Sequence, residues 1–279
     1  METSSPTSDL SLNLDLVRTL LISFVRDETH HAGFSRGVIG LSGGVDSAVA
    51  AALAAEALGK EKLRGVILPH RVSSPDTARD AALVAESLGI PTETIDITPM
   101  VDPYLAAAGT PDTVRAGNVM ARQRMTVLFD ISARDRALVI GTSNKTEILL
   151  GYGTLFGDMA CAINPLGDLY KTQVQQLAAH LRIPARIIEK KPSADLWQGQ
   201  TDEGELGFSY SDVDRLLYQL IDERRSEDEL IAMGYAAEFI RRVQSLIMKN
   251  QFKRRPPLIA KISHRTVNVD FRYARDWGT

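Results

Sequence analysis

Residues 38–47, VIGLSGGVDS, followed directly by AVAAALAAEAL at 48–58, decide the fold of this chain. A short apolar run breaks into Ser-Gly-Gly-x-Asp-Ser and enters a segment of helix-forming composition, so the pattern predicts a strand, a turn and a helix start. Gly43 and Gly44 permit backbone conformations that are closed to other residues, and the first amides of a helix lack intrahelical partners. We therefore expect an anion-binding loop, with Ser42 and Ser47 as donors and Asp46 as a carboxylate for a divalent cation.

Two better-known phosphate loops do not fit this pattern. A Walker A loop ends in Gly-Lys-Ser/Thr, but no lysine occurs between Arg36 and Lys60, and the dinucleotide fingerprint is also absent. The simplest structural alternative is a strand-to-helix turn in which Asp46 and Ser47 are first-turn residues favoured by the helix dipole. Two glycines, two serines and an aspartate within six residues exceed what such a turn needs.

The composition is that of a folded enzyme with a sizeable core. The chain has 279 residues, 44% of them apolar, and a formal net charge of −3, which argues against a general nucleic-acid binder. No apolar run approaches the length of a membrane span, and the first residues lack the order of a secretory signal. A single cysteine, Cys161, agrees with a reducing compartment, so we expect a cytoplasmic protein without membrane or nucleic-acid partners.

Strand-like and helical segments alternate over the first two thirds of the chain. Apolar runs at 36–41, 63–68, 93–97 and 137–140 are separated by helical stretches at 46–58, 76–88 and 116–133. This rhythm predicts an α/β fold with a doubly wound, mostly parallel sheet and helices on both faces. Ligands bind at the carboxyl ends of such strands, where SGG, PHRVSS (69–74) and GTSNKTE (141–147) lie.

The remaining segments complete the predicted organisation. We expect a disordered tail over 1–13, an amphipathic helix from Leu14, an α/β core to about residue 170 and a helical C-terminal part, all of 14–279 forming one domain. Helices are predicted at 171–181, 210–223 and 235–250. Residues 190–209 combine glycine, proline and charge without periodicity, and a surface loop of this length is a candidate lid.

The SGGVDS motif resembles the pyrophosphate loop of the N-type ATP pyrophosphatases, which cleave ATP between its α and β phosphates. Alone it leaves open GMP, asparagine and argininosuccinate synthetases and tRNA thiolation enzymes. Later motifs occur in the order and spacing of NAD synthetase, and the resemblance is to the form that uses ammonia. These motifs are ARQRM (121–125), VIGTSNKTE (139–147), YGTLFGDMACAINPLGDLYKTQ (152–173), KKPSADL (190–196), DEGELGFSY (202–210) and FKRRPP (252–257).

The resemblance implies a five-stranded sheet of the adenine nucleotide α-hydrolase type and a complete set of site residues. Asp46, Lys171 and Glu147 would be catalytic, with Asp46 and Glu147 as Mg²⁺ ligands, and Arg122 and Lys253 would hold deamido-NAD. ATP, a co-substrate, would contact Gly40, Leu41, Ser42, Gly43, Gly44, Val45, Asp46, Ser47, Thr142, Lys171 and Ser193. The implied reaction adenylates the nicotinate carboxylate of deamido-NAD and amidates it with ammonia.

This chain departs from the family pattern at three positions of the deamido-NAD site. Many ammonia-dependent members have lysine and aspartate where this chain has Leu155 and Ala162, and histidine where it has Phe252. The stretch GDMACAINPL is closer to glutamine-using members, although no amidase domain precedes residue 14. We therefore expect free ammonia as donor, with a separate glutaminase subunit as the alternative, and a homodimer with α-helical contacts.

Simpler interpretations and competing functions remain open at this point. Glu147 could merely cap a helix at 145–150, Arg122 could lie on a solvated helix face, and KRRPP (253–257) could be a small basic patch. A tRNA-modifying adenylating enzyme would require an RNA-binding appendage and catalytic cysteines. A catalytically silent nucleotide sensor would keep the fold and lose turnover.

Overall fold

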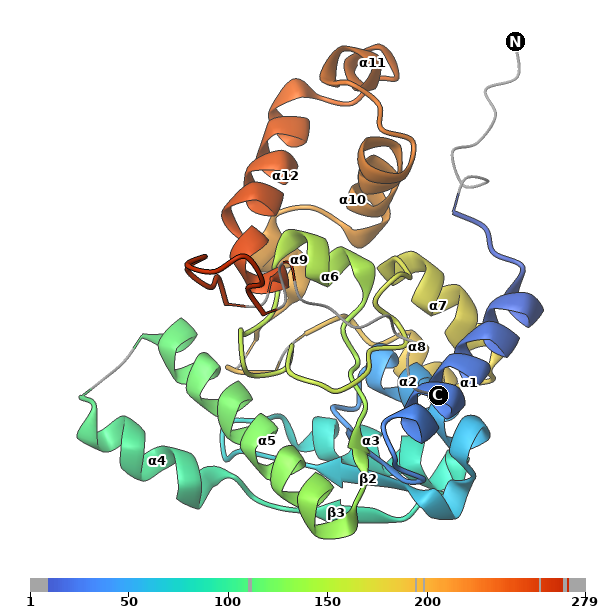
Figure 1. Cartoon of the computed structure of the whole chain (residues 1–279), viewed down its shortest axis with the longest axis vertical. Coiled ribbons are helices and arrows are strands. Elements are labelled where there is room, and N and C mark those ends of the chain that lie inside the picture. The colour runs from blue at the N-terminus through green and yellow to red at the C-terminus, as the bar shows by residue number, and fades with distance from the viewer. Residues whose placement is uncertain are drawn as a thin grey trace.

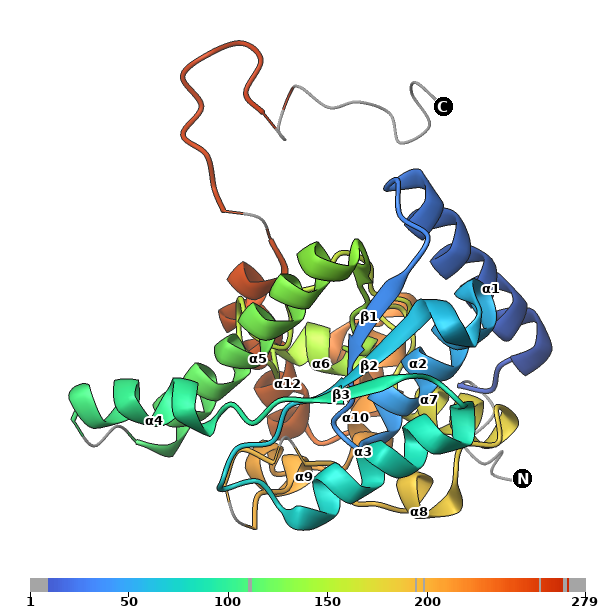
Figure 2. The same cartoon turned by 90° about the horizontal axis from the view of Figure 1, so that it is seen from below.

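The computed structural model describes residues 10–109, 112–193, 195–197, 199–255, 257–267 and 270. Its centre is a four-stranded sheet with strand order β3-β2-β1-β4, and every pairing is parallel (Figures 1 and 2). The strands are β1 (Gly37–Gly40), β2 (Leu63–Ile67), β3 (Thr92–Thr94) and β4 (Leu138–Val139). The predicted parallel α/β fold is confirmed.

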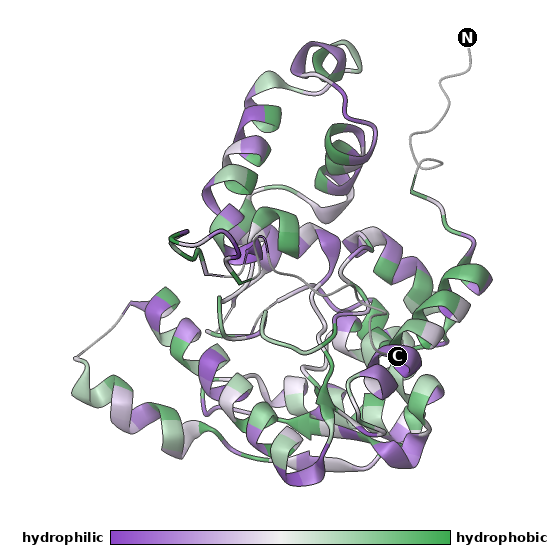
Figure 3. Ribbon diagram, viewed as in Figure 1, coloured by the Kyte–Doolittle hydropathy of each residue, from purple (hydrophilic) through white to green (hydrophobic). Residues whose placement is uncertain are grey.

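Helices cover both faces because successive strand residues point to opposite sides. In β1, Val38 belongs to one hydrophobic core and Ile39 to the other. The Ile39 face is covered by α2 (Val45–Leu58), with α1 (Leu14–His31), α3 (Pro75–Leu88), α7 (Lys171–His180) and α8 (Ala185–Ile188) around it. The Val38 face is covered by α4 (Thr98–Ala107) and α5 (Thr113–Asp135). Hydrophobic residues accordingly gather along the strands and α2 (Figure 3).

The expected fifth strand does not form in the described part of the chain. Beside β4 there is only an isolated parallel bridge between Ile140 and Ile163. Pro165 lies two residues farther on and has no N–H to continue the ladder, which gives a physical reason for the short pairing. The strand count of five was therefore wrong, while the sheet type was right.

The C-terminal part is helical, as predicted, and builds a third hydrophobic core. It comprises α6 (Lys145–Leu150), α9 (Asp202–Leu206), α10 (Tyr210–Leu217), a π-helical turn (Tyr218–Asp222), α11 (Glu227–Ala232) and α12 (Ala237–Lys249). Leu150 of α6, Leu216 of α10 and Ile240 of α12 meet in this core. In Figure 1, α6 and α7 lie between the sheet and the helices α10 and α12, so the two parts of the molecule meet there. Two 3-10 turns, Lys60–Lys62 and Gln251–Arg254, complete the secondary structure.

Two boundaries differ from the predictions. Residues 1–9 of the expected tail lie outside the described residues, but Leu10 is buried, and its carbonyl accepts hydrogen bonds from Gln173 and Gln176. The packed chain therefore begins before residue 14. The expected surface loop at 190–209 contains α9 and buries Gln200 and Asp202.

Among the described residues, every helix is too short or too polar to span a bilayer.

Candidate active site

The anion loop lies between the end of β1 and α2 and is pressed against α3. Gly43 has φ of +67°, and a Cβ at this position would lie 2.6 Å from the Thr77 carbonyl oxygen and 2.9 Å from the Asp80 Cβ. Glycine is therefore required here for both backbone conformation and space. Ser47 Oγ donates to the Gly44 carbonyl at 3.0 Å and lies 3.1 Å from Ser42 Oγ. These contacts fix the loop with its hydroxyls at the start of α2.

A cavity of about 710 Å³ opens at the carboxyl ends of β1, β2 and β4. Its lining includes every residue predicted to contact ATP except Gly43, whose neighbours on both sides line it, and it also includes Glu147 and Lys253. The predicted residues lie far apart in the sequence, so their convergence on one cavity depends on the fold. The predicted ATP-binding residues on its surface are Gly40, Leu41, Ser42, Gly44, Val45, Asp46, Ser47, Thr142, Lys171 and Ser193.

Three helices bring one lysine and two carboxylates together beside the anion loop. Lys171 Nζ, at the start of α7, lies 2.5 Å from Asp46 Oδ2 on α2 and 3.3 Å from Glu147 Oε1 on α6. Asn144 connects the two acids, because its Nδ2 donates to Asp46 Oδ1 at 2.9 Å and its Oδ1 accepts from the Glu147 amide at 3.0 Å. We call Asp46, Glu147 and Lys171 the acidic cluster, since they leave one negative charge when all three are ionised.

Burial sets the electrostatics of this cluster. Desolvation raises the pKa of Glu147 to about 8, with Asp46 acting in the same direction and Lys171 opposing it. Burial lowers the pKa of Lys171, but the carboxylates of Asp46 and Glu147 outweigh that effect and raise it overall. Only 3% of the Lys171 side chain is exposed. The ammonium is therefore held charged within a nearly dry site.

The acidic cluster fits a magnesium ion that completes its shell from other oxygens. Magnesium prefers one or two carboxylates together with phosphate and water oxygens, and two carboxylates converge here. Within the described residues, no group of three or more His, Cys, Asp or Glu side chains could hold a metal by itself. Asp46 and Glu147 could supply two of the oxygens around such an ion.

A second set of buried polar groups lies on α9 and its neighbours. Asp202 accepts hydrogen bonds from the Tyr152 and Tyr210 hydroxyls, both at 3.0 Å, and Tyr152 also donates to Glu205 at 3.0 Å. Burial is the main cause that raises the pKa of Asp202, opposed by Lys171 and the two phenols. Lys171 Nζ lies 5.1 Å from the centre of the Tyr210 ring. These contacts join residues 200–210 to the acidic cluster.

The basic side chains that were predicted to hold deamido-NAD are bound to backbone carbonyls. Arg122 Nε donates to the Leu155 carbonyl at 3.2 Å, and Lys253 Nζ donates to the carbonyls of Gly151 and Gly153 at 2.7 and 2.9 Å. Arg254 donates to the Leu149 carbonyl at 2.7 Å. Lys253 and Arg254 thus satisfy carbonyls at the end of α6, where cations are favoured. The suspected basic patch is turned inward at these two residues.

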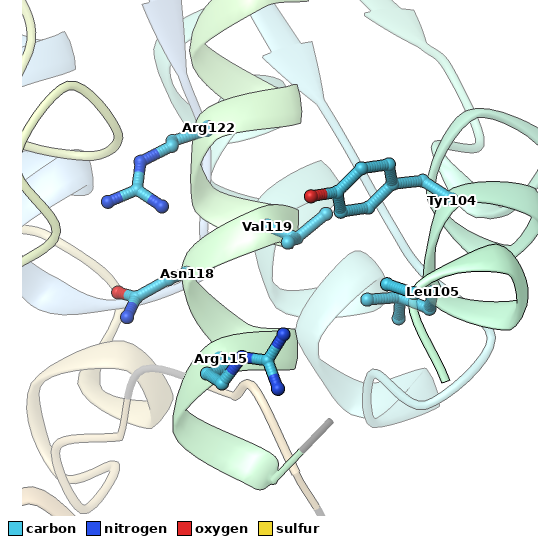
Figure 4. Close-up of a pocket in the computed structure, with 7 residues that line it drawn as sticks. Tyr104, Leu105, Arg115, Asn118, Val119 and Arg122 are labelled. Carbon is cyan, nitrogen blue, oxygen red and sulfur yellow. The ribbon is translucent and has the colours of Figure 1, made fainter. Parts of the chain in front are cut away.

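Arg122 lines a smaller pocket and does not line the main cavity. This pocket, about 170 Å³, lies between α4 and α5 and is also lined by Tyr104, Arg115 and Asn118. Figure 4 shows Arg122 and Asn118 projecting from the same side of α5, with Tyr104 and Leu105 on α4. Lys253 lines the main cavity, so the two residues predicted to hold deamido-NAD are separated here.

Several residues of the site were not predicted from the sequence. Asn144 lies within a quoted motif, and its N-x-x-E spacing is a capping-box pattern that was a usable signal. Arg124 is buried against the cavity, where it donates to the Leu68 carbonyl and burial lowers its pKa. Asp202 and Lys190 also line the cavity, and their roles depend on tertiary contacts that no local pattern reveals.

Comparisons with known proteins agree on one family. The family model for NAD synthase matches residues 17–257. The NH(3)-dependent NAD(+) synthetase of Trichlorobacter lovleyi is 54% identical over 271 residues, which are 97% of this chain and 99% of the relative. Among solved structures, NMN synthetase from Francisella tularensis has a TM-score of 0.80 at 34% identity, covering 90% of this chain and 99% of that one. NH3-dependent NAD synthetase from Campylobacter jejuni has a TM-score of 0.78 at 32% identity, covering 90% and 100%.

Proposed function

The chain belongs to the NAD synthase family, and from this premise we propose that it makes NAD from deamido-NAD, ATP and ammonia, releasing AMP and pyrophosphate. The observation that carries the proposal is the meeting of Asp46, Glu147 and Lys171 beside the anion loop. This arrangement has the donors for a triphosphate and the carboxylates for its counter-ion. The product has a new carbon–nitrogen bond, which would make the enzyme a ligase.

The reaction requires two substitutions in sequence. The nicotinate carboxylate oxygen attacks the α-phosphorus of ATP, forming an acyl adenylate as the bond to pyrophosphate breaks. The ammonia nitrogen then attacks the activated carbonyl carbon, the bond to AMP breaks, and a proton leaves the nitrogen to give the amide. Both steps need close positioning of the reactants and exclusion of water that would hydrolyse the adenylate.

The residues of the chain perform the binding and charge neutralisation in this scheme. The amides at the start of α2, with Ser42 and Ser47, would hold phosphate oxygens, and Lys171 would oppose the charge that develops on pyrophosphate. Asp46 and Glu147 would hold a magnesium ion, which when bound supplies further positive charge to the phosphates. Thr142 and Ser193 would contact the nucleotide from the cavity wall, and Arg122 and Lys253 would hold deamido-NAD.

Residues 190–209 would act as the lid that excludes water. Ser193 lines the cavity, and Asp195 accepts hydrogen bonds from the Ser74 amide at 3.1 and 3.2 Å. The segment therefore already crosses from the C-terminal part to the loop before α3. A segment that crosses the cavity in this way would keep water from the acyl adenylate.

The decisive assay mixes purified protein with ATP, magnesium, deamido-NAD and an ammonium salt. Equal amounts of NAD, AMP and pyrophosphate are expected, and absence of NAD would refute the proposal. ATP binding without pyrophosphate release would instead indicate a nucleotide sensor. Adenylation of tRNA would indicate the RNA-modifying alternative.

Two further arms refine the substrate. The Francisella neighbour is described as an NMN synthetase, so nicotinate mononucleotide is the matched competitor of deamido-NAD. We expect deamido-NAD to react faster, because the relatives that are more than 50% identical are named NAD(+) synthetases. Glutamine should not replace ammonia with the isolated chain, and restoration of glutamine use by an added glutaminase would indicate the alternative, a separate glutaminase subunit.

We also propose a cytoplasmic homodimer. Exposed Leu16 and Leu20 on α1, at 54% and 58% exposure, support α1 as one contact surface, and α12 is the second candidate. ATP and the dinucleotide are substrates that the cytoplasm supplies. Light scattering at micromolar concentration should give twice the chain mass, and a monomer would contradict the dimer.

A further inference from the structure

A second ionic cluster lies on the other side of the anion loop. Asp80 of α3 accepts hydrogen bonds from Arg186 Nε of α8 at 2.6 Å and from Lys190 Nζ at 2.8 Å. Only 3% of the Asp80 side chain is exposed. We call Asp80, Arg186 and Lys190 the basic cluster. Asp76, which also lines the cavity, pairs with Arg186 at 3.2 Å and with Arg79 at 2.8 Å, so the two carboxylates and three cations of this region together leave one positive charge.

Lys190 connects this cluster to the anion loop and to the cavity. Its Nζ donates to the Gly43 carbonyl at 3.4 Å as well as to Asp80, and its side chain lines the main cavity. An ammonium has three donors, and these two contacts account for two of them. With 29% of its side chain exposed, Lys190 is accessible to a ligand in the cavity.

The close packing of Gly43 against α3 fixes the position of the anion loop relative to Asp80, and therefore relative to the Lys190 ammonium. The loop lies so close to α3 that a Cβ on Gly43 would collide with Asp80. Asp80 therefore supports the loop and holds the lysine at the same time. Arg186 holds the other oxygen of Asp80 from outside the cavity, so the carboxylate remains fixed.

The opposite charges of the two clusters indicate different ligands. The acidic cluster offers two carboxylates to a metal cation and carries a net negative charge once Glu147 is ionised, whereas the region of the basic cluster has a net positive charge that suits a phosphate. A nucleotide whose phosphates rest on the anion loop would have one cluster on each side. Only the basic cluster supplies a cation that carboxylates have not fully neutralised.

We propose that Lys190 binds the terminal phosphates of the nucleotide and holds them as pyrophosphate after cleavage, and that Asp80 is its positioning residue. The inference rests on the proposed function, since that function defines ATP as the nucleotide. It adds to the site a lysine that was assigned no role from the sequence. It also assigns Asp80, which lies under the loop, an effect on ligand affinity.

The test measures binding of magnesium pyrophosphate to the full chain by calorimetry. Lys190→Met should raise the dissociation constant about tenfold or more, because a charged hydrogen bond to phosphate is lost. The same variant should raise KM for ATP by a similar factor and leave KM for deamido-NAD within twofold. Lys145→Met is the matched control: Lys145 is also held by carboxylates, Asp222 and Asp168, but does not line the cavity, so pyrophosphate affinity should stay within twofold.

Asp80→Asn gives a second variant that does not remove the lysine. It should weaken pyrophosphate binding about threefold to tenfold, because the lysine keeps its charge but loses its anchor. Unchanged pyrophosphate affinity in a folded Lys190→Met variant would overturn the inference. If Lys190→Met does not fold, unchanged affinity in folded Asp80→Asn would overturn it. A wild-type protein that forms NAD while these variants bind pyrophosphate normally would refute only this inference, whereas a wild-type protein that forms no NAD would refute the proposed function.

Discussion

The site has two walls that are held together by different kinds of contact: the ATP wall beside the anion loop, and the opposite wall, which is the segment 151–155 with Lys253 at the main cavity and Arg122 at the smaller pocket. On the ATP wall, side chains from α2, α6 and α7 contact one another, as Lys171 contacts Asp46 and Glu147. On the opposite wall, Arg122 and Lys253 contact backbone carbonyls of residues 151–155. An ionic cluster of side chains depends on the identity of each residue, whereas a carbonyl accepts from any donor. The ATP wall is therefore expected to be the more sensitive of the two to substitution.

The largest effect is expected when the shared cation of the ATP wall is removed. Lys171→Met should lower the rate of NAD formation about 10³-fold or more, because the charge on pyrophosphate is no longer opposed. Lys145→Met is the control: Lys145 also bridges two carboxylates, Asp222 at 2.7 Å and Asp168 at 3.2 Å, but does not line the cavity. Its rate should stay within twofold of wild type.

Circular dichroism should show that Lys171→Met remains folded before its rate is interpreted. The variant leaves two half-buried carboxylates without their cation, which destabilises a folded protein. A folded variant that keeps more than a tenth of the wild-type rate would show that the two walls do not differ as described.

The same comparison shows what the sequence could reveal. The anion loop was predictable because its glycines, serines and aspartate are adjacent, and the strand and helix around it follow from local pattern. Family motifs identified Glu147 and Lys171, which the fold then placed beside Asp46. Lys190 and Asp80 lie 110 residues apart in sequence, and their contact follows only from the packing of α3 against the segment after α8.

The opposite wall was less predictable for a related reason. The family resemblance predicts a side chain that holds deamido-NAD at position 155, where this chain has leucine. The backbone carbonyl of Leu155, which any residue has, contacts Arg122. The predicted number of strands was wrong for a similar reason. The bridge between Ile140 and Ile163 pairs only two residues, and residue types alone do not show that it fails to extend into a strand. Contacts made by the backbone leave little trace in residue types.

A second prediction separates metal binding from helix capping on the ATP wall. Glu147 and Glu229 are both the N3 residue of a capping box, with Asn144 and Ser226 as the respective N-caps. If Glu147 only caps α6, both glutamine variants should behave alike. We expect Glu147→Gln to lower NAD formation about 10²-fold and to require more magnesium, whereas Glu229→Gln should stay within twofold. Equal rates for the two variants would favour capping.

A third, smaller effect is expected on the opposite wall. Arg122→Met should raise KM for deamido-NAD about tenfold and leave KM for ATP within twofold, because one charged contact to the second substrate is lost. Arg134→Met, also on α5 but paired with Glu93 and Asp135, is the control and should change neither constant. A change in both constants would mean that Arg122 acts by holding the Leu155 segment.

The smallest effect concerns the pH dependence of stability. As the pH rises, the contribution of Glu147 to stability should decrease, whereas that of Glu229 should increase. Burial raises the folded pKa of Glu147 to about 8, so its contribution to stability is present below the unfolded value near 4.5 and is lost as the pH rises toward 8. Hydrogen bonds from Ser226 lower the folded pKa of Glu229, so its contribution is present above the unfolded value and is lost as the pH falls. Denaturant unfolding between pH 3 and pH 9 should therefore show Glu147→Gln gaining stability relative to wild type as the pH rises from about 4.5 to 8. Glu229→Gln should approach wild type only at acidic pH. If the free energy of unfolding of the two variants changes with pH in the same way, the pKa of Glu147 is not raised by burial. The Glu147 carboxylate would then be no different from that of an ordinary capping residue such as Glu229, and the ATP wall would lack the desolvated carboxylate that sets it apart from the opposite wall.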